Sequence, residues 1–254
     1  MSDSILLNIN THSLNVEKTH DFNVRFDSLT LDHNSDYHIA LLSYNIPYSW
    51  RNISAAQNNN VFRFSIDGGT SFTSVLIPDG NYGTQDLNLE LQQLVVNNGG
   101  VTDQFSFVAD YNTVRVDLLF YNTNYQIDFS VPNTFREILG FNSQVYLGTT
   151  VLHRAENNSN ITNNIDSISI NNSIVDSANI LLNNKQSSSL FHVTNYGSGP
   201  GSYLSSQVAY PVYLPINIAG NIHDINISIR NQDDELVDLN NENITLSFHI
   251  KKMN

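Results

Sequence analysis

Apolar and polar residues alternate with a period of two through much of the chain, and this pattern constrains the fold more than any other feature. It occurs in FNVRF (22–26), YHIALLSY (37–44), VFRFSI (61–66), FTSVLI (72–77), FSFVA (105–109), VRVDLLF (114–120) and YQIDFSV (125–131). A strand places successive side chains on opposite faces, so each stretch offers one apolar face to a core. Asn, Asp or Gly, which favour turns, bound most of them. The sequence therefore predicts an all-β, antiparallel protein.

Two polar connections predict tight hairpins between these strands. One runs through Asp110 to Asn112, and the other is DGGTS at 67–71. With 254 residues, of which 40% are hydrophobic, the chain can bury a full core, and β-sandwiches of this size often remain one domain. We therefore expect a single domain over 1–254.

One stretch has a helical period and predicts an amphipathic helix at about 84–96. Thr84 or Asp86 can cap its start, and Asn98 followed by Gly99 and Gly100 can end it. Four apolar residues fall on one face of this helix: Leu87, Leu91, Leu94 and Val95. We expect the helix to lie on a sheet.

A second, shorter helix is predicted at about 134–139, within NTFREILGF. Thr134 and Glu137 have the spacing of a capping box, and Gly140 stands where a helix commonly ends. Four apolar residues around it are expected to close one end of the core: Phe135, Ile138, Leu139 and Phe141.

The sequence becomes rich in Asn and Ser from about 153 to 189, with brief apolar pieces at 165–170 and 174–182. This texture predicts a surface insertion that does not belong to the core. NYGSGPGSYLSS (195–206) then predicts a flexible bridge, and the prolines of VAYPVYLPINI (208–218) predict an edge strand or a bulge.

The balance of charges disfavours several classes of partner. The formal net charge is -13, which gives no basic surface for a nucleic-acid backbone. The chain lacks cysteine, so disulfides, thiolate nucleophiles and cysteine metal sites are excluded. The apolar run Ile5 to Leu7 is too short for a signal peptide, and no stretch approaches the roughly 20 apolar residues of a membrane span. We expect a chain made in the cytoplasm and not inserted into a membrane.

The acidic run SIRNQDDELVDLNNENITLSF (228–248) raises the question of a calcium loop. An EF-hand frame that starts at Asp233 puts Leu236 where Gly is required and Ile244 where Glu is required, and one that starts at Asp238 fails equally. Alternating strands flank the run at 225–229 and 244–250. A polar hairpin connection between two strands is favoured over a metal site.

The remaining motifs give no catalytic, cofactor or metal site. The eight histidines show no HxH, HxxxH or HExxH spacing, and no phosphate-binding glycine pattern occurs. GSGPGS lacks the strand-to-helix context of a nucleophile elbow. We expect a protein that is not an enzyme.

Aromatic residues are numerous and charges are few, a composition that suits extensive contact between proteins. Acid-free stretches that carry aromatics mark a possible subunit interface, although the same rings can fill the core. The candidates are Tyr48, Trp50, Arg51, Tyr196, Tyr203, Tyr210 and Tyr213. A carbohydrate- or receptor-binding module, with a sugar stacked on Trp50, is the alternative.

Four stretches in this order resemble the minor capsid, or penton, proteins of polinton-like viruses, adintoviruses and virophages. They are LDHNSDYHIALLSYNIPYSWRNIS (31–54), VLIPDGNYGTQDLNLEL (75–91), YQIDFSVPNTFREILGF (125–141) and VYLPINIAGNIHDINISIRNQDDELVDLNNENITLSFHIKK (212–252). The Asn/Ser-rich segment at 153–206 departs from this resemblance.

The resemblance implies a jelly-roll protein, made in a host cell, that forms a homopentamer at the vertices of an icosahedral virion. Trimers of a double jelly-roll major capsid protein would surround it, and a host receptor or glycan is a further possible partner. The resemblance also implies that the acidic run connects the last two strands of the roll.

Overall fold

The computed structural model describes residues 4–32, 34–161, 165–176, 181–182, 185–194, 199, 201–217 and 220–253. The chain divides into two compact units: Met1–Trp50 with Ile165–Asn254, here the roll unit, and Arg51–Asn164, here the inserted unit. Each contains its own cluster of buried hydrophobic side chains. This grouping differs from the single domain expected over 1–254, because the apolar residues of 51–164 form a core of their own.

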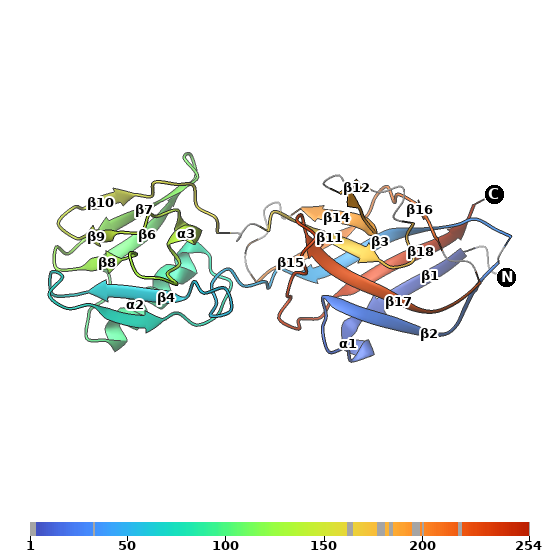
Figure 1. Ribbon diagram of the computed structural model, residues 1–254, viewed down its shortest axis with the longest axis horizontal. Helices are drawn as coiled ribbons and strands as arrows, with labels where there is room; N and C mark the ends of the chain where they lie inside the picture. The colour runs from blue at the N-terminus through green and yellow to red at the C-terminus, as the bar shows by residue number, and fades with distance from the viewer. Residues whose placement is uncertain are drawn as a thin grey trace. The chain divides into compact units, whose positions relative to one another are not determined.

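Two antiparallel sheets build the roll unit (Figure 1). The first sheet has the order β1 (Ser4–Asn10), β18 (Thr245–Lys252), β3 (Tyr37–Pro47), β15 (Tyr203–Gln207), and β16 (Leu214–Pro215) also pairs with β3. The second sheet has the order β14 (Ser189–Thr194), β11 (Ser167–Asn172), β17 (Gly220–Asn231), β2 (Asp21–Leu31). The short helix α1 (Thr11–Leu14) joins β1 to β2, and β12 (Leu181–Leu182) pairs with β13 (Lys185–Gln186).

The order of these strands is that of a jelly roll. Counting the eight main strands from one to eight along the chain gives 1-8-3-6 in the first sheet and 5-4-7-2 in the second. The chain thus changes sheet at every step except the hairpin from β11 to β14, and the first strand ends up beside the last. Two four-stranded sheets wound in this way form the jelly roll, so the all-β jelly-roll prediction is confirmed.

Alternation along the last two long strands builds the core between the sheets. Ile227 and Ile229 of β17 and Leu246 and Phe248 of β18 are all fully buried in one cluster, as the sequence predicted. The predicted hairpin between these strands is wrong, because β17 lies in the second sheet and β18 in the first. The connection has to cross between sheets, and it buries three apolar side chains on the way: Val237, Leu239 and Ile244.

The prediction that 153–189 is a surface insertion is also wrong. Strand β11 pairs with β14 on one side and β17 on the other, and Ile168 and Ile170 face the core of the roll. Within this range, residues 162–164, 177–180 and 183–184 lie outside the described residues. The segment inserted into the roll is instead 51–164, which follows β3 and precedes β11 in the sequence.

The inserted unit contains two further sheets. One has the order β5 (Thr73–Leu76), β4 (Val61–Ser65), β8 (Gln126–Asp128), β9 (Val145–Leu147). The other has the order β10 (Leu152–Arg154), β7 (Arg115–Phe120), β6 (Phe105–Asp110). The predicted hairpins at 67–71 and 110–112 are confirmed, since β4 pairs with β5 and β6 with β7.

Helix α2 (Thr84–Asn97) confirms the predicted amphipathic helix, with Leu87, Leu91 and Val95 buried. Its predicted cap is wrong: Gly83 precedes the first turn, and no side chain bonds to that turn. The side chain of Asn88 donates to the Phe107 carbonyl oxygen at 2.6 Å, which fastens the helix to strand β6.

Helix α3 (Arg136–Leu139) confirms the second helix, although Phe135 rather than Thr134 precedes its first turn. The predicted capping box is therefore wrong. Gly140 ends the helix with φ 85°, as expected, and all four apolar residues around the helix are buried: Phe135, Ile138, Leu139 and Phe141.

Gly140 is predicted to tolerate no side chain. A Cβ atom there would lie 2.3 Å from the backbone oxygen of Asn157, in addition to the strain of a positive φ. Gly68 also has a positive φ but has open space around it, which makes Gly68→Ala a matched control. We expect Gly68→Ala to lower the free energy of unfolding by about 1 kcal/mol and Gly140→Ala by a further 1–3 kcal/mol or so, measured by urea denaturation. Equal losses would show that the Asn157 backbone moves away without cost.

Candidate interaction surfaces

Two of the residues proposed for a subunit interface lie in the core of the roll unit. Tyr48 and Trp50 are each only 3% exposed, and their rings pack with centroids 4.2 Å apart. Tyr48 continues the line of β3, and its backbone amide donates to the Ser202 oxygen at 2.8 Å. For these two residues the interface prediction is wrong, because the alternating pattern that ends β3 turns them inward. A sugar cannot stack on the buried Trp50.

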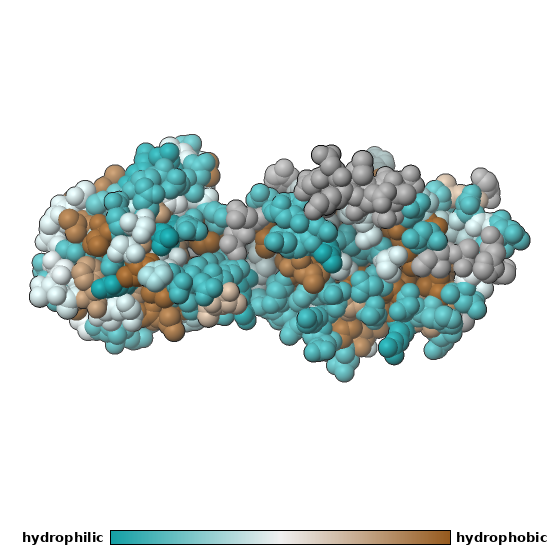
Figure 2. Space-filling view, in the orientation of Figure 1, coloured by the Kyte–Doolittle hydropathy of each residue, from teal (hydrophilic) through white to brown (hydrophobic). Residues whose placement is uncertain are grey.

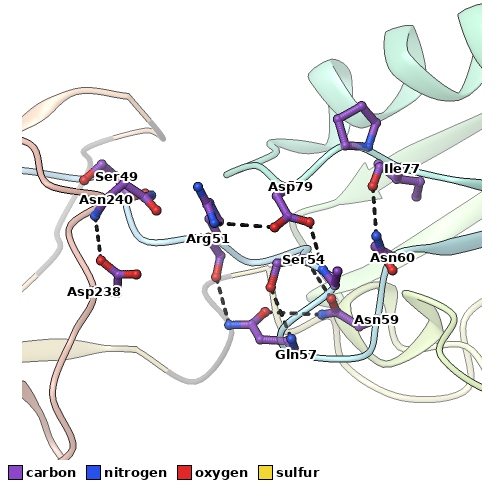
Figure 3. Close-up of polar contacts among 12 residues, drawn as sticks. Ser49, Arg51, Ser54, Gln57, Asn59, Asn60, Ile77, Asp79, Asp238 and Asn240 are labelled. Atoms are coloured by element: carbon purple, nitrogen blue, oxygen red, sulfur yellow. Dashed lines mark hydrogen bonds and ion pairs between the residues drawn. The ribbon is translucent and has the colours of Figure 1, made fainter.

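Arg51 is partly exposed and belongs to the first loop of the inserted unit (Figure 3). Its guanidinium lies 3.4 Å from Asp79, whose second carboxylate oxygen accepts from the Ala55 amide at 2.8 Å. Gln57 donates to the Arg51 carbonyl oxygen at 3.1 Å. These contacts order the loop, so Arg51 stabilises the conformation of the inserted unit.

Tyr203 and Tyr210 are the exposed tyrosines of the proposed interface. Tyr203 is 53% exposed at the start of β15, the edge strand of the first sheet, and Tyr210 is 90% exposed. Val212, close to Tyr210 in sequence, is also exposed. Tyr196 lies outside the described residues. We call Tyr203, Tyr210 and Val212 the β15 patch.

Tyr213 is half-buried and packs on the outer side of β18. Its hydroxyl lies 2.7 Å from Nδ1 of His249, whose Nε2 lies 2.5 Å from the Ser4 hydroxyl. Lys251 stands over the Tyr213 ring at 5.8 Å. The residues of β18 that alternate with the buried Phe248 and its neighbours thus form a polar, hydrogen-bonded face.

Sequence reasoning missed an apolar surface at the opposite edge of the first sheet. Leu6 in the edge strand β1 is 58% exposed, and Leu14 in α1 is also exposed. A groove of about 320 Å³ runs here, with Val24 and Phe26 of β2 in its wall. The alternation in SILLNIN was a usable signal for this strand. We call Leu6 and Leu14 the β1 patch.

A polar pocket of about 430 Å³ opens in the inserted unit between the loop at 57–59 and helix α3. Arg136 lies in its wall, and its guanidinium donates to the Thr134 hydroxyl at 3.2 Å and to the carbonyl oxygens of Phe129 and Val131 at 3.4 Å each. These bonds hold the loop 129–134 around the side chain. They assign Arg136 a structural role.

The Asp67 carboxylate is held in a ring of hydrogen bonds at the β4–β5 turn. The Ser71 hydroxyl donates at 2.6 Å, the Ser71 amide at 3.0 Å and the Ser65 hydroxyl at 2.7 Å. These bonds, those from Ser71 first, lower the pKa of Asp67 to about 2 from the ordinary value of 3.8. The ionised carboxylate therefore stabilises the turn.

Because the pKa of Asp67 is lowered in the folded state, its contribution to stability is present above pH 3.8 and is lost as the pH falls through about 2. We expect Ser71→Ala to raise the pKa of Asp67, measured by NMR of the side-chain carboxyl carbon. Ser74→Ala, a similar change in strand β5, should leave that pKa where it is. An unchanged pKa in Ser71→Ala would show that the turn does not hold the carboxylate as described.

Tyr146 and Glu156 form a partly buried hydrogen-bonded contact in the inserted unit. The Tyr146 hydroxyl donates to both carboxylate oxygens of Glu156, at 3.0 and 2.9 Å. Burial, and then the neighbouring carboxylate, raises the pKa of Tyr146 to about 12. The tyrosine remains a neutral donor at ordinary pH, which suits a structural bond rather than proton transfer.

Across the described ranges, no three His, Asp or Glu side chains come together in a way that would hold a metal ion. None of the helices in that part of the chain has the length and apolar character needed to cross a bilayer. Exposed apolar side chains occur at both edges of the first sheet of the roll unit, as they do at several positions of the inserted unit.

No family model matches the chain, and no curated protein matches it either. Among solved structures it is similar to the crystal structure of the selenomethionine-labelled mavirus penton protein, with a TM-score of 0.51 and 13% identity. That match covers 98% of this chain and 100% of the mavirus chain. A chain in the cryo-EM structure of the Sputnik virophage matches at a TM-score of 0.43 and 13% identity, over 99% of this chain and 98% of the other. The mavirus match shows the fold.

Proposed function

We propose that this chain is a minor capsid protein of an icosahedral virion, in which five copies form each vertex. The observation that carries the proposal is the fold shared with the mavirus penton protein over 98% of this chain and 100% of that one. This likeness extends over both the roll unit and the inserted unit. The four stretches of similar sequence support the same assignment independently.

A ring of five identical copies requires two different patches on each copy, because every contact is head-to-tail. The β1 patch and the β15 patch lie at opposite edges of the first sheet, since the strand order is β1-β18-β3-β15. The β15 patch of one copy then meets the β1 patch of the next. This arrangement replaces the part of our interface prediction that rested on Tyr48 and Trp50.

The low charge of the two patches is compatible with contact between copies. Each copy has a formal net charge of -13, so copies in a ring repel one another unless their contacts exclude acids. The stretches 4–14 and 201–217 contain no Asp, Glu, Lys or Arg. On the face shown in Figure 2, apolar residues form separate patches within a mostly hydrophilic surface. Depletion of charge together with exposed apolar side chains is typical of interface cores.

Within this proposal the partners are further copies of the chain and trimers of the major capsid protein, and the protein resides in the virion after synthesis in the host cytoplasm. A host receptor or glycan is a possible partner of the assembled vertex. The alternative of a lectin-like module with Trp50 as its platform loses its supporting observation, because Trp50 is buried.

Native mass spectrometry of the purified chain, alone and mixed with major capsid trimers, tests the proposal. We expect a species with five times the mass of the 28.5 kDa chain in at least one of the two samples. A monomer in both samples at every concentration, or a closed dimer or trimer, would contradict it.

A further inference from the structure

A second polar pocket, of about 270 Å³, lies on the outer face of the second sheet of the roll unit. Strand β17 contributes Asn226, Ser228 and Arg230, which alternate with the buried isoleucines on the inner side. Nine polar residues line this pocket: Asn171, Asn172, Ser173, Ser187, Ser188, Asn226, Ser228, Arg230 and Asp234. None of them is apolar, which distinguishes the pocket from the groove beside β1. We call it the β17 pocket.

Two asparagines of this pocket carry buried polar atoms that no described residue satisfies. Asn171 is 4% exposed and Asn172 is 1% exposed. Among the described residues, the side-chain oxygen of Asn171 has no hydrogen-bond donor, and the side-chain nitrogen of Asn172 has no acceptor. The Asn172 oxygen, in contrast, accepts from the Ile174 amide at 3.1 Å, which fixes the amide group in place.

An unpaired buried polar atom costs about 1–3 kcal/mol, and native proteins seldom leave one without a role. Asn171 pairs across the sheet with Ser228, so its side chain lies on the same outer face as the pocket. Its oxygen is an acceptor without a donor, and the Asn172 nitrogen is a donor without an acceptor. Asn172 pairs with Ile227, so its side chain lies toward the inner side of the sheet, and the Asn171 oxygen is the unsatisfied atom on the pocket side. A ligand that completes it must offer a hydrogen-bond donor.

The charge within the pocket is balanced. Arg230 donates from Nε to the Ser228 hydroxyl at 3.2 Å and from Nη1 to the Asp234 carbonyl oxygen at 2.6 Å. Its Nη1 also lies 3.7 Å from the Asp234 carboxylate. Because this carboxylate offsets the guanidinium charge, the pocket has no excess positive charge to attract an anion.

We propose that the β17 pocket binds a neutral, hydroxyl-rich ligand the size of one sugar residue. A hydroxyl group donates as well as accepts, so one hydroxyl of a sugar ring satisfies the Asn171 oxygen, and the others bond to the Asn and Ser side chains of the lining. The volume is just below the roughly 300–1,000 Å³ of pockets for drug-sized ligands and suits a single sugar ring. The described residues that line the pocket include no aromatic ring on which a sugar could stack, so the expected dissociation constant is about millimolar.

This inference goes beyond the capsid proposal and does not depend on it, since the pocket belongs to the roll unit of a single chain. The test uses the whole chain labelled with ¹⁵N and titrated with the methyl glycosides of glucose, galactose, mannose and N-acetylglucosamine. We expect saturable shifts of the amide signals of Asn171, Asn172 and Ser228 with at least one glycoside. Sodium phosphate serves as the anionic probe and is expected to cause none.

Asn171→Leu should weaken glycoside binding at least tenfold. The melting temperature should be unchanged or raised, because the substitution removes an unsatisfied polar atom. Asn23→Leu makes the same change at an exposed position of β2, in the same sheet but outside the pocket, and should bind as the parent does. Ser228→Ala provides a second pocket variant if Asn171→Leu does not fold.

Three results would overturn the proposal. The first is the absence of a response to all four glycosides by the folded parent. The second is undiminished binding by the pocket variants. The third is a larger response to phosphate than to any glycoside, which would mean an anion site. The oligomeric state of the chain affects none of these outcomes, so failure here is separate from failure of the capsid proposal.

Discussion

Replacing Phe248 with Ala is expected to lower the free energy of unfolding by about 3–5 kcal/mol, the usual cost of removing a fully buried ring. Phe248 is entirely buried between the two sheets of the roll, and it belongs to the same cluster as Ile227 and Ile229. Removing the ring therefore leaves a cavity between the first and the second sheet of the roll unit. Denaturation in urea, followed by circular dichroism, measures it.

Tyr210→Ala is the matched control for this experiment, because it truncates an aromatic side chain that is 90% exposed. Its effect on the free energy of unfolding is expected to stay within about 0.5 kcal/mol. If Phe248→Ala lowered the free energy of unfolding no more than the control does, the conclusion that the two sheets pack on each other around Phe248 would be wrong.

Replacing both Tyr203 and Tyr210 with Glu is expected to weaken assembly at least a hundredfold while the monomer stays folded. In the proposed ring these side chains are buried against the next copy, and two carboxylates there must be desolvated without a partner. Because both residues are exposed in the single chain, folding should be almost unaffected. Sedimentation velocity across a concentration series measures the assembly.

Tyr111→Glu with Tyr121→Glu adds the same charges at exposed positions of the inserted unit and controls for the general increase in repulsion. This double variant should assemble as the parent does. Normal assembly of the Tyr203/Tyr210 variant would remove the β15 patch from the interface, although another surface could still form the ring.

Period-two alternation predicted a strand well wherever the inward-facing residues are apolar over several consecutive repeats. The stretches 37–44 and 61–66 became β3 and β4 almost unchanged. The place of strand β11 in the core was not predicted, because only Ile168 and Ile170 of SISINN are apolar and the surrounding Asn and Ser residues resemble an exposed segment. Its place in the core depends on pairing with β17, which is distant in sequence.

The division into two units was not visible in the sequence for a similar reason. Strands of the inserted unit alternate as those of the roll unit do, so local pattern cannot tell which strands share a core. The boundaries near Trp50 and Ile165 carry no run of Gly or Pro that would indicate a linker. Long-range pairing, such as β3 with β18, decides the grouping.

The candidate surfaces were predicted only in part, because an aromatic residue in an acid-free stretch can face either way. Alternation continues past the end of β3 and directs Tyr48 and Trp50 inward, whereas Tyr203 and Tyr210 lie on and after an edge strand and remain exposed. The β17 pocket was beyond prediction, since it forms where β11 and β17 lie side by side. Asparagine and serine alone gave no signal for it.

The position of this chain in the particle that contains it tests the central claim most directly. A cryo-EM reconstruction of that particle, with the vertices refined without imposed symmetry, would place the eight-stranded roll unambiguously. The account predicts five copies around each fivefold axis, with the β1 edge of one roll beside the β15 edge of the next. Vertices built from another protein, with this chain at threefold or twofold positions or bound singly to the outside, would contradict it.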